Sequence, residues 1–119
     1  MAAKPGITVY HNPACGTSRN VLAAIRAAGH EPVVVEYLKT GWQEKQLRAL
    51  LRQAGASPRD WLREKGSPAA ELGLLDPAVD DETILQAMLK HPILVNRPVV
   101  VTAKGTALCR PADKVAGLL

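Results

Sequence analysis

Cys15 lies in a polar turn, residues 12–16, between an apolar β-branched stretch and a helical pattern. A thiol at the start of a helix faces backbone N–H groups and the positive end of the helix dipole, which both favour the thiolate. With a free pKa near 8.5, roughly three per cent of a thiol is ionised at pH 7, and lowering that pKa by about 2 makes the thiolate the major form. Buried cysteines are often inert, but the small polar residues Gly16, Thr17 and Ser18 are poor surroundings for a core side chain. The sequence therefore predicts a reactive Cys15.

The neighbours of Cys15 indicate how the thiolate is stabilised and what it attacks. We expect Ser18 to contribute a hydroxyl donor and His11 to contribute a positive charge when protonated, a local hydrogen bond being the alternative role for His11. The first amides of the helix, at Gly16 and Thr17, form a candidate anion cradle. This arrangement is typical of a nucleophilic thiolate that acts on a bound oxyanion.

The spacing around Cys15 excludes two other kinds of thiol site. Ser18 stands where a dithiol redox motif would place its second cysteine, so no dithiol cycle can occur within this turn. Only three residues separate Cys15 from Arg19, and the loops of Cys-containing phosphatases place more residues between their cysteine and arginine. The turn is therefore not a phosphatase loop of that kind. Cys109 is predicted to be a strand residue, and its role in redox chemistry stays open.

The bulk composition is that of an ordinary globular protein. With 119 residues, 47% hydrophobic and 22% charged, residues 1–119 are expected to form a single domain. Two cysteines are too few for a disulfide scaffold, and residues 1–6 carry no apolar run, so we expect a cytoplasmic protein without a leader or membrane span. The net charge of +4 comes from scattered basic residues with few aromatics, which disfavours nucleic-acid binding. His30 and His91 have no metal-ligand spacing with cysteine, so no metal is expected.

The hydrophobic patterns predict an α/β fold. A strand over residues 6–11, a helix from Ser18 to about Gly29 and a strand over residues 32–38 predict a βαβ unit with parallel strands. Helical patterns follow at residues 43–54, 57–63 and 80–91, and the chain closes with two strands, a hairpin turn at Lys104-Gly105 and a helix from Arg110-Pro111. The order β-α-β, helices, β-β-α is that of a thioredoxin-like mixed sheet with a central helical insertion.

Three stretches resemble the glutaredoxin-linked arsenate reductase family: Tyr10-His11-Asn12-Pro13-Ala14-Cys15-Gly16-Thr17-Ser18-Arg19, His91-Pro92-Ile93-Leu94-Val95-Asn96-Arg97-Pro98 and Leu108-Cys109-Arg110-Pro111. The resemblance implies that the Cys15 thiolate displaces an oxygen of arsenate and forms a thiol–arsenate ester. Glutathione, a co-substrate rather than a bound cofactor, then attacks the ester. Glutaredoxin removes the glutathione as a mixed disulfide, and arsenite leaves.

The same resemblance implies that three arginines surround the anion, namely Arg63, Arg97 and Arg110, and that the Arg97-Pro98 bond is cis. Arginine suits this task because it stays charged and presents a planar set of donors to an oxyanion. The resemblance to the family is weaker near Arg63, because residues 67–70 lack a tyrosine that the family often has. Arg59, four residues earlier on the same predicted helical face, is therefore the alternative anion contact.

Two other functions compete with arsenate reduction. One is a glutathione-dependent thiol reductase of the same superfamily, which Arg97 and Arg110 in their matching contexts disfavour. The other is a redox-responsive transcription regulator similar to the Spx proteins, which bind RNA polymerase. Spx proteins typically carry Cys-x-x-Cys at the place of Cys15, and Ser18 in place of the second cysteine disfavours an intramolecular switch.

Overall fold

The computed structural model describes residues 6–119. The expected absence of a leader concerns residues 1–5 in particular, which lie outside the described residues. The chain divides into two compact units, Met1–Thr40 with Arg97–Leu119 and, separately, Gly41–Asn96. The single domain expected over residues 1–119 stays a prediction.

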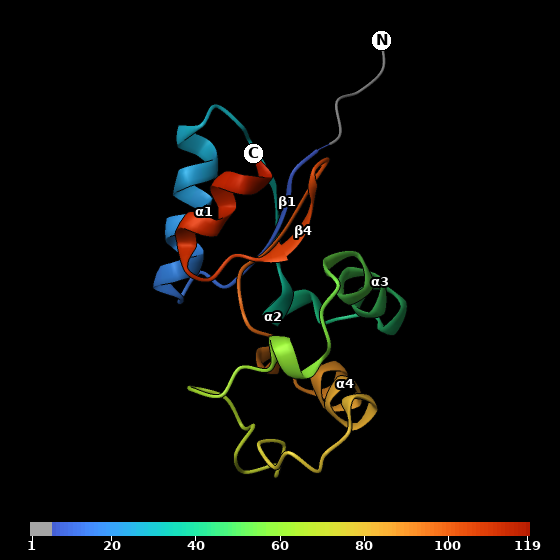
Figure 1. Cartoon of the computed structure of the whole chain (residues 1–119). Helices are drawn as coiled ribbons and strands as arrows, with labels where there is room; N and C mark the ends of the chain where they lie inside the picture. The colour runs from blue at the N-terminus through green and yellow to red at the C-terminus, as the bar shows by residue number, and fades with distance from the viewer. Residues whose placement is uncertain (1–5) are drawn as a thin grey trace. The chain divides into compact units, whose positions relative to one another are not determined.

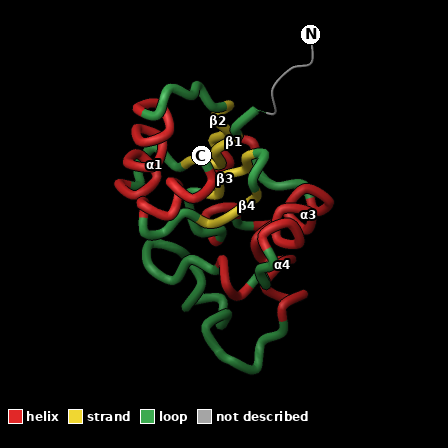
Figure 2. The backbone as a smooth tube through the Cα atoms, turned by 45° about the horizontal axis from the view of Figure 1, so that its top comes forward, coloured by secondary structure: helices red, strands yellow, loops and turns green. Residues whose placement is uncertain are grey.

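The first unit is built on a four-stranded mixed sheet. Its strands are β1 (Thr8–His11), β2 (Val33–Glu36), β3 (Val99–Thr102) and β4 (Gly105–Leu108). They lie in the order β2-β1-β3-β4, visible as the yellow segments of Figure 2. β1 and β2 are parallel, whereas β3 runs antiparallel to both β1 and β4. This arrangement confirms the predicted mixed sheet and its parallel βαβ unit.

Two helical segments cover one face of this sheet. The helix α1 (Gly16–Ala27) and the 3-10 helix η3 (Ala112–Leu118) lie side by side in Figure 1. Val9 and Val100 are paired across β1 and β3, and both are fully buried. They form one core cluster with residues of α1, η3 and the end of β4: Val21, Ile25, Cys109 and Val115. Burial of these apolar side chains holds α1, and therefore its first turn, against the sheet.

The first helix begins earlier than its hydrophobic pattern indicates. We expected it to start at Ser18, but α1 starts at Gly16 with Cys15 as its N-cap residue. Gly16 and Thr17 carry no apolar signal, and so periodicity alone could not include them in the helix. The helix ends close to its predicted limit at Gly29. Gly29 follows α1 with a φ of 92°, a conformation that glycine adopts at low cost.

The β3–β4 hairpin also differs by one residue from its prediction. Thr102 pairs with Gly105, and so the turn is Ala103-Lys104 rather than Lys104-Gly105. Gly105 opens β4 with a φ of 153°, which side-chain-bearing residues rarely adopt. The glycine thus marks the first position of the strand and not the turn itself.

The second unit is helical. It contains α3 (Glu44–Ala54), η1 (Arg59–Trp61), α4 (Asp81–Lys90) and η2 (Pro92–Leu94), while the first unit also holds the short α2 (Tyr37–Thr40). The two long helices agree with their predictions. α3 ends at Gly55 in the left-handed conformation, and Asp80 caps α4 by accepting a hydrogen bond from the Thr83 N–H at 2.8 Å.

The predicted helix over residues 57–63 is wrong. Only Arg59–Trp61 forms a 3-10 turn, and Leu62 is extended and forms an isolated β-bridge with Val95. The Arg63 N–H donates to the Leu94 carbonyl at 2.7 Å. Pairing with the segment after α4 therefore overrides the helical pattern, and Arg59 and Arg63 do not share a helical face.

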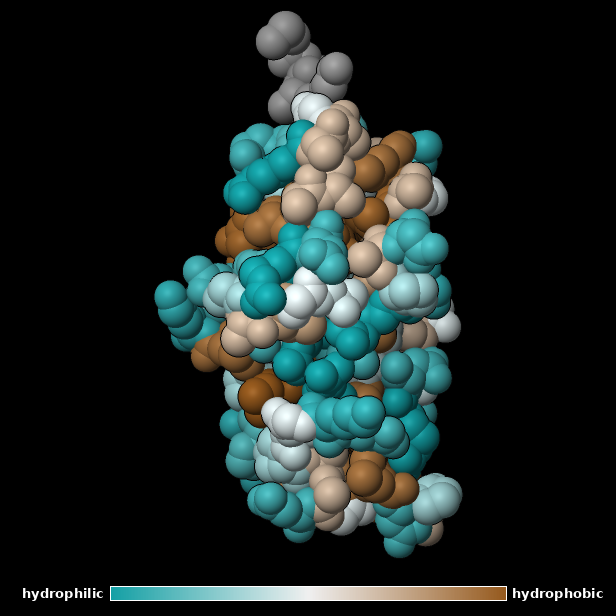
Figure 3. Space-filling model, turned by 90° about the vertical axis from the view of Figure 1, so that its left-hand side faces the viewer, coloured by the Kyte–Doolittle hydropathy of each residue, from teal (hydrophilic) through white to brown (hydrophobic). Residues whose placement is uncertain are grey.

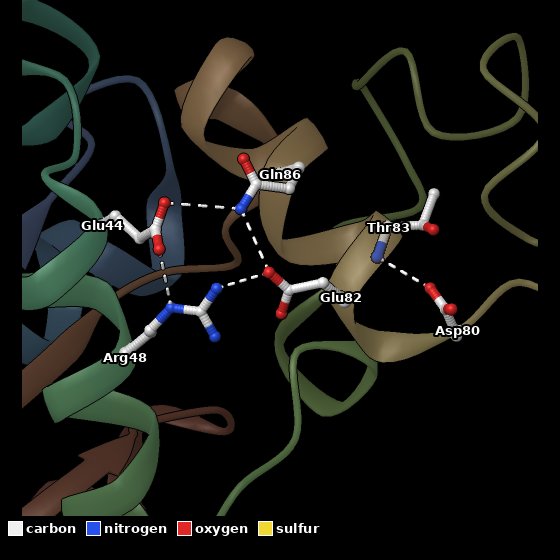
Figure 4. A network of polar contacts seen from close by, with 6 residues as sticks. All are labelled: Glu44, Arg48, Asp80, Glu82, Thr83 and Gln86. Atoms are coloured by element: carbon white, nitrogen blue, oxygen red, sulfur yellow. Dashed lines mark hydrogen bonds and ion pairs between the residues drawn. The ribbon is translucent and has the colours of Figure 1, made fainter.

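A polar network joins α3 to α4, as Figure 4 shows. Arg48 of α3 lies between Glu44, at 3.1 Å, and Glu82 of α4. Gln86 donates to the carboxylates of Glu44 and Glu82 at 3.4 and 3.2 Å. The pKa of Glu82 is lowered mainly by its hydrogen bond with Arg48. Because these groups are exposed, the network adds little to the stability of the fold.

Among the described residues, no helix combines the length and apolar character needed to cross a bilayer. In Figure 3, hydrophilic residues cover much of the face in view, with hydrophobic patches between them.

Candidate active site

The topology of the first unit brings three separate segments to one edge of the sheet. β1 ends at His11, immediately before the turn that holds Cys15. Near this end Tyr10 pairs with Val99, the first residue of β3, and Val99 also pairs with Leu108, the last residue of β4. The segments before β3 and after β4 therefore meet the turn after β1.

The turn that carries Cys15 is fixed by its own backbone hydrogen bonds. The Asn12 side-chain oxygen accepts from the Ala14 N–H at 2.9 Å, and the Asn12 carbonyl accepts from the Cys15 N–H at 3.0 Å. Asn12 is buried and shapes the turn, as residues of this type commonly do. The Cys15 carbonyl accepts the first helical bond, from Arg19, at 3.0 Å. Cys15 is thereby held, partly exposed, at the amino end of α1.

Two arginines from the end of the chain reach the sulfur. The Nη1 atom of Arg110 lies 3.6 Å from Cys15 Sγ and also donates to the Arg97 carbonyl at 2.9 Å. Arg97 is only 7% exposed, and it too acts on the sulfur, because it lowers the pKa of the Cys15 thiol. The Arg97-Pro98 bond is cis, which confirms the expectation, and the Arg110-Pro111 bond is also cis, which we had not predicted.

These contacts make Cys15 an acidic thiol. Burial acts to raise its pKa, but a hydrogen bond from the Ser18 backbone N–H and contacts with Arg110 and Arg97 outweigh it and lower the pKa to about 7. About half of the thiol is therefore ionised at neutral pH, far more than in a free cysteine. The thiolate is the form that acts as a nucleophile.

Ser18 and His11 are hydrogen-bonded to each other, which is the alternative role expected for His11. The Ser18 hydroxyl accepts from the Asn12 N–H at 3.1 Å and is hydrogen-bonded to His11 Nδ1 at 2.6 Å, so it is the backbone N–H of Ser18 that serves the sulfur. His11 is buried, and this burial is the main reason why its pKa is lowered from 6.5. The lowered pKa favours the uncharged form of His11 at neutral pH, and a role of His11 in lowering the pKa of Cys15 stays a prediction.

Comparison with known proteins now identifies the family. Residues 10–118 match the ArsC family. The chain belongs to the ArsC family. It is 58% identical to the arsenate reductase of Rhizobium meliloti, an alignment that covers 95% of this chain and 81% of the relative. It is 49% identical to the arsenate reductase of Escherichia coli K12, with 95% and 80% covered.

A solved structure supports the ArsC assignment and the fold. The arsenate reductase of Vibrio cholerae superposes with a TM-score of 0.89 at 34% sequence identity, over 98% of this chain and all of that one. This likeness confirms the α/β thioredoxin-like fold predicted from the order of elements.

The third arginine of the ArsC prediction lies in the second unit. Arg63 is partly exposed, and its Nε donates to the Lys65 carbonyl at 2.8 Å while its Nη1 donates to Asn96 Oδ1 at 3.4 Å. The structure brings Arg97 and Arg110 to Cys15 within the first unit, whereas a contact between Arg63 and the anion stays a prediction.

Arg59, the alternative anion contact, instead hydrogen-bonds to the backbone of the second unit. Its guanidinium donates to three backbone carbonyls, at 3.3 Å to Leu74, 3.1 Å to Asp76 and 2.6 Å to Val79. These bonds tie the loop before α4 to the 3-10 turn η1. Arg59 therefore organises the second unit and is a poor candidate for substrate binding.

Cys109 lacks the properties of a reactive thiol. It is fully buried in the core of the first unit, and this burial raises its pKa to about 11. Its N–H donates to the Pro98 carbonyl at 2.9 Å, which fastens the segment after β4 to the segment before β3. Cys109 thus helps to position Arg97 and Arg110 through the backbone. Within residues 6–119 no group of three or more His, Cys, Asp or Glu side chains could hold a metal ion.

Proposed function

We propose that this protein is an arsenate reductase whose nucleophile is Cys15. The observation that carries the proposal is the contact of Arg110 Nη1 with Cys15 Sγ at 3.6 Å, and Arg97 also lowers the pKa of the same thiol. Two guanidinium groups stabilise the thiolate and also attract a tetrahedral oxyanion to it. Relatives that are 49% and 58% identical over most of the chain bear the name arsenate reductase.

In the first step, the thiolate of Cys15 attacks the arsenic atom of bound arsenate. An arsenic–sulfur bond forms and an arsenic–oxygen bond breaks, and the oxygen leaves as water after it takes up two protons. Arg97 and Arg110 stabilise the negative charge that the arsenate oxygens carry through this exchange. The N–H groups of Gly16 and Thr17, in the first helical turn, lack acceptors within the helix and are proposed as donors to the same oxygens. Arg63 is proposed as a third guanidinium contact.

The electrons come from two external thiols. Glutathione attacks the arsenic of the thiol–arsenate ester, where a second arsenic–sulfur bond forms and a second arsenic–oxygen bond breaks, and that oxygen leaves as water after protonation. The thiol of glutaredoxin then attacks the glutathione sulfur and removes the glutathione as a mixed disulfide. Formation of this disulfide leaves two electrons on arsenic, which passes from the pentavalent to the trivalent state. Water releases arsenite and restores Cys15. External donors suit this chain because Cys109, the other cysteine, is buried and strongly protonated. Dependence on reduced thiols is also the reason to propose a cytoplasmic location.

A reconstituted assay tests the proposal. The purified protein is mixed with arsenate, glutathione and glutaredoxin, and arsenite is measured over time, with each component omitted in turn. We expect release of arsenite that stops when Cys15 is replaced by serine. Full turnover by Cys15→Ser, or reduction of a glutathione-mixed disulfide with no arsenite release by the native chain, would refute arsenate reduction through this thiol.

A further inference from the structure

Arg19 places an exposed positive charge on the turn that contains Cys15. It is an exposed residue in the first turn of α1, and its Nη1 donates to the Pro13 carbonyl at 2.9 Å. A Cβ atom built on Gly16 would lie 3.8 Å from Arg19 Nη2. The guanidinium is therefore held close to Pro13 and Gly16, the residues that flank Ala14 and Cys15 in this turn.

The environment of Arg19 differs from that of the arginines that touch the sulfur. Arg97 is nearly buried, and Arg110 donates both to the sulfur and to a carbonyl. The first turn of α1 contains no acidic residue, so nothing in that turn neutralises Arg19. In contrast, Arg26 of the same helix forms an ion pair with Glu31 at 3.1 Å. Arg19 presents its charge to solvent on the turn that contains Cys15.

We propose that Arg19 is a specificity-determining residue for the second reactant at Cys15, where it binds a carboxylate of an incoming acidic thiol or disulfide of the glutathione type. An arginine already fixed by one hydrogen bond keeps further N–H donors for a carboxylate, and less side-chain freedom is lost on binding. The two sets of arginines then bind different reactants. Arg97 and Arg110 serve the small anion at the sulfur, and Arg19 orients the larger molecule that arrives from solvent. The inference rests on the proposed role of Cys15 as a nucleophile.

Thiol–disulfide exchange at Cys15 tests the inference without arsenate. The thiolate attacks one sulfur of glutathione disulfide, and the sulfur–sulfur bond breaks. A mixed disulfide forms between Cys15 and one glutathione, and the other glutathione leaves as a thiolate, so no further oxidant or reductant is required. Hydroxyethyl disulfide undergoes the same exchange but carries no charge. The ratio of the two second-order rate constants isolates the contribution of the carboxylates.

Both rates are measured at pH 7 by mass spectrometry of the intact chain, for the native protein and three variants. We expect Arg19→Gln to lower the ratio about three- to fivefold at low salt, the size typical of an exposed charge pair. Arg19→Lys retains the charge and should recover at least half of that loss. Arg26→Gln, the matched control on the same helix, should leave the ratio unchanged. The effect of Arg19→Gln should shrink in high salt because exposed charges are screened.

An unchanged ratio in Arg19→Gln would overturn the inference. It would also be overturned if the variant slowed both disulfides equally and raised the pKa of Cys15 in iodoacetamide titrations, since Arg19 would then only hold the turn. The absence of arsenate separates this result from the proposed function. A chain that shows the expected ratio but releases no arsenite would support the role of Arg19 and refute arsenate reduction.

Discussion

Arg110 donates to the sulfur of Cys15 at 3.6 Å although 95 positions separate the two residues in the sequence. The contact exists because β3 runs antiparallel to both β1 and β4, which places the end of β4 beside the end of β1. The same Nη1 atom donates to the Arg97 carbonyl at 2.9 Å, so one guanidinium links the nucleophile to the segment before β3. The low pKa of Cys15 therefore depends on the sheet, which brings Arg110 to the sulfur, as well as on the helix that follows the cysteine.

The first prediction concerns the pH dependence of Cys15 alkylation. With a pKa of about 7, the thiolate fraction rises with pH, and so the rate of reaction with iodoacetamide should climb below pH 7 and level off above it. The midpoint is read from rates measured between pH 5 and 9. Arg110→Gln should move the midpoint to higher pH, because a cation that stabilises the thiolate is lost. A midpoint above pH 8.5 in the native protein would contradict the site geometry.

The second prediction concerns the anion. Removing one preorganised donor from an oxyanion site typically costs about 2.7–4 kcal/mol in the transition state, so Arg97→Gln and Arg110→Gln should each lower kcat/KM for arsenate about 100- to 1000-fold. Steady-state kinetics at saturating glutathione and glutaredoxin measure this loss. Arg26→Gln, an exposed charge change on α1, serves as the control and should stay within about twofold of the native value. Equal losses in all three variants would point to an effect of net charge alone.

The third prediction separates Arg59 from Arg63. Arg59→Gln removes a guanidinium that donates to the carbonyls of Leu74, Asp76 and Val79, and it should lower the free energy of unfolding by about 1–3 kcal/mol. Arg63→Gln should change stability less and instead lower kcat/KM for arsenate. Urea titrations and steady-state kinetics on both variants give the two quantities. The reverse pattern, with Arg59 needed for turnover and Arg63 for stability, would refute both assignments.

Local sequence patterns predict the helices of the second unit well. Leu47, Leu50 and Leu51 recur on one face and are all buried in α3, and Gly55 ends that helix with a φ of 64°. Such features depend on residues within one or two turns of each other, and so they can be derived without knowledge of the rest of the chain. The predicted helix through Arg63 is wrong for the opposite reason, because a pairing between Leu62 and Val95, distant in sequence, determines that segment.

The candidate site is only partly predictable from sequence. The position of Cys15 at a helix start follows from the turn residues, but only the family resemblance points to Arg97 and Arg110, because neither periodicity nor composition links them to the cysteine. The sequence also does not show which partner each side chain hydrogen-bonds to. Ser18 has a hydroxyl and a backbone N–H, and only the structure shows that the hydroxyl is bonded to His11 and the Asn12 N–H.

The fourth prediction follows from this buried network. Ser18→Ala removes the hydroxyl that joins His11 Nδ1 and the Asn12 N–H, and leaves both groups buried without that partner. Loss of a partner for a buried polar group typically costs about 1–3 kcal/mol, which urea unfolding measures. Because the backbone N–H of residue 18 remains, the alkylation midpoint of Cys15 should shift by less than in Arg110→Gln. A larger shift would mean that the hydroxyl itself contacts the sulfur.

The fifth prediction is that catalysis needs only one of the two cysteines. Cys109 is buried with a pKa raised to about 11, so it stays protonated at neutral pH and is shielded from reagents. Cys109→Ala should therefore keep the rate of arsenite release and the alkylation midpoint of Cys15 close to native values. Its unfolding free energy should fall by about 1–2 kcal/mol, because a small buried side chain is truncated. If Cys109→Ala instead abolished turnover while it remained folded by circular dichroism, Cys109 would have to take part in the redox cycle. A disulfide between Cys15 and Cys109, trapped during turnover and detected by mass spectrometry, would lead to the same conclusion and would remove the need for an external thiol at that step.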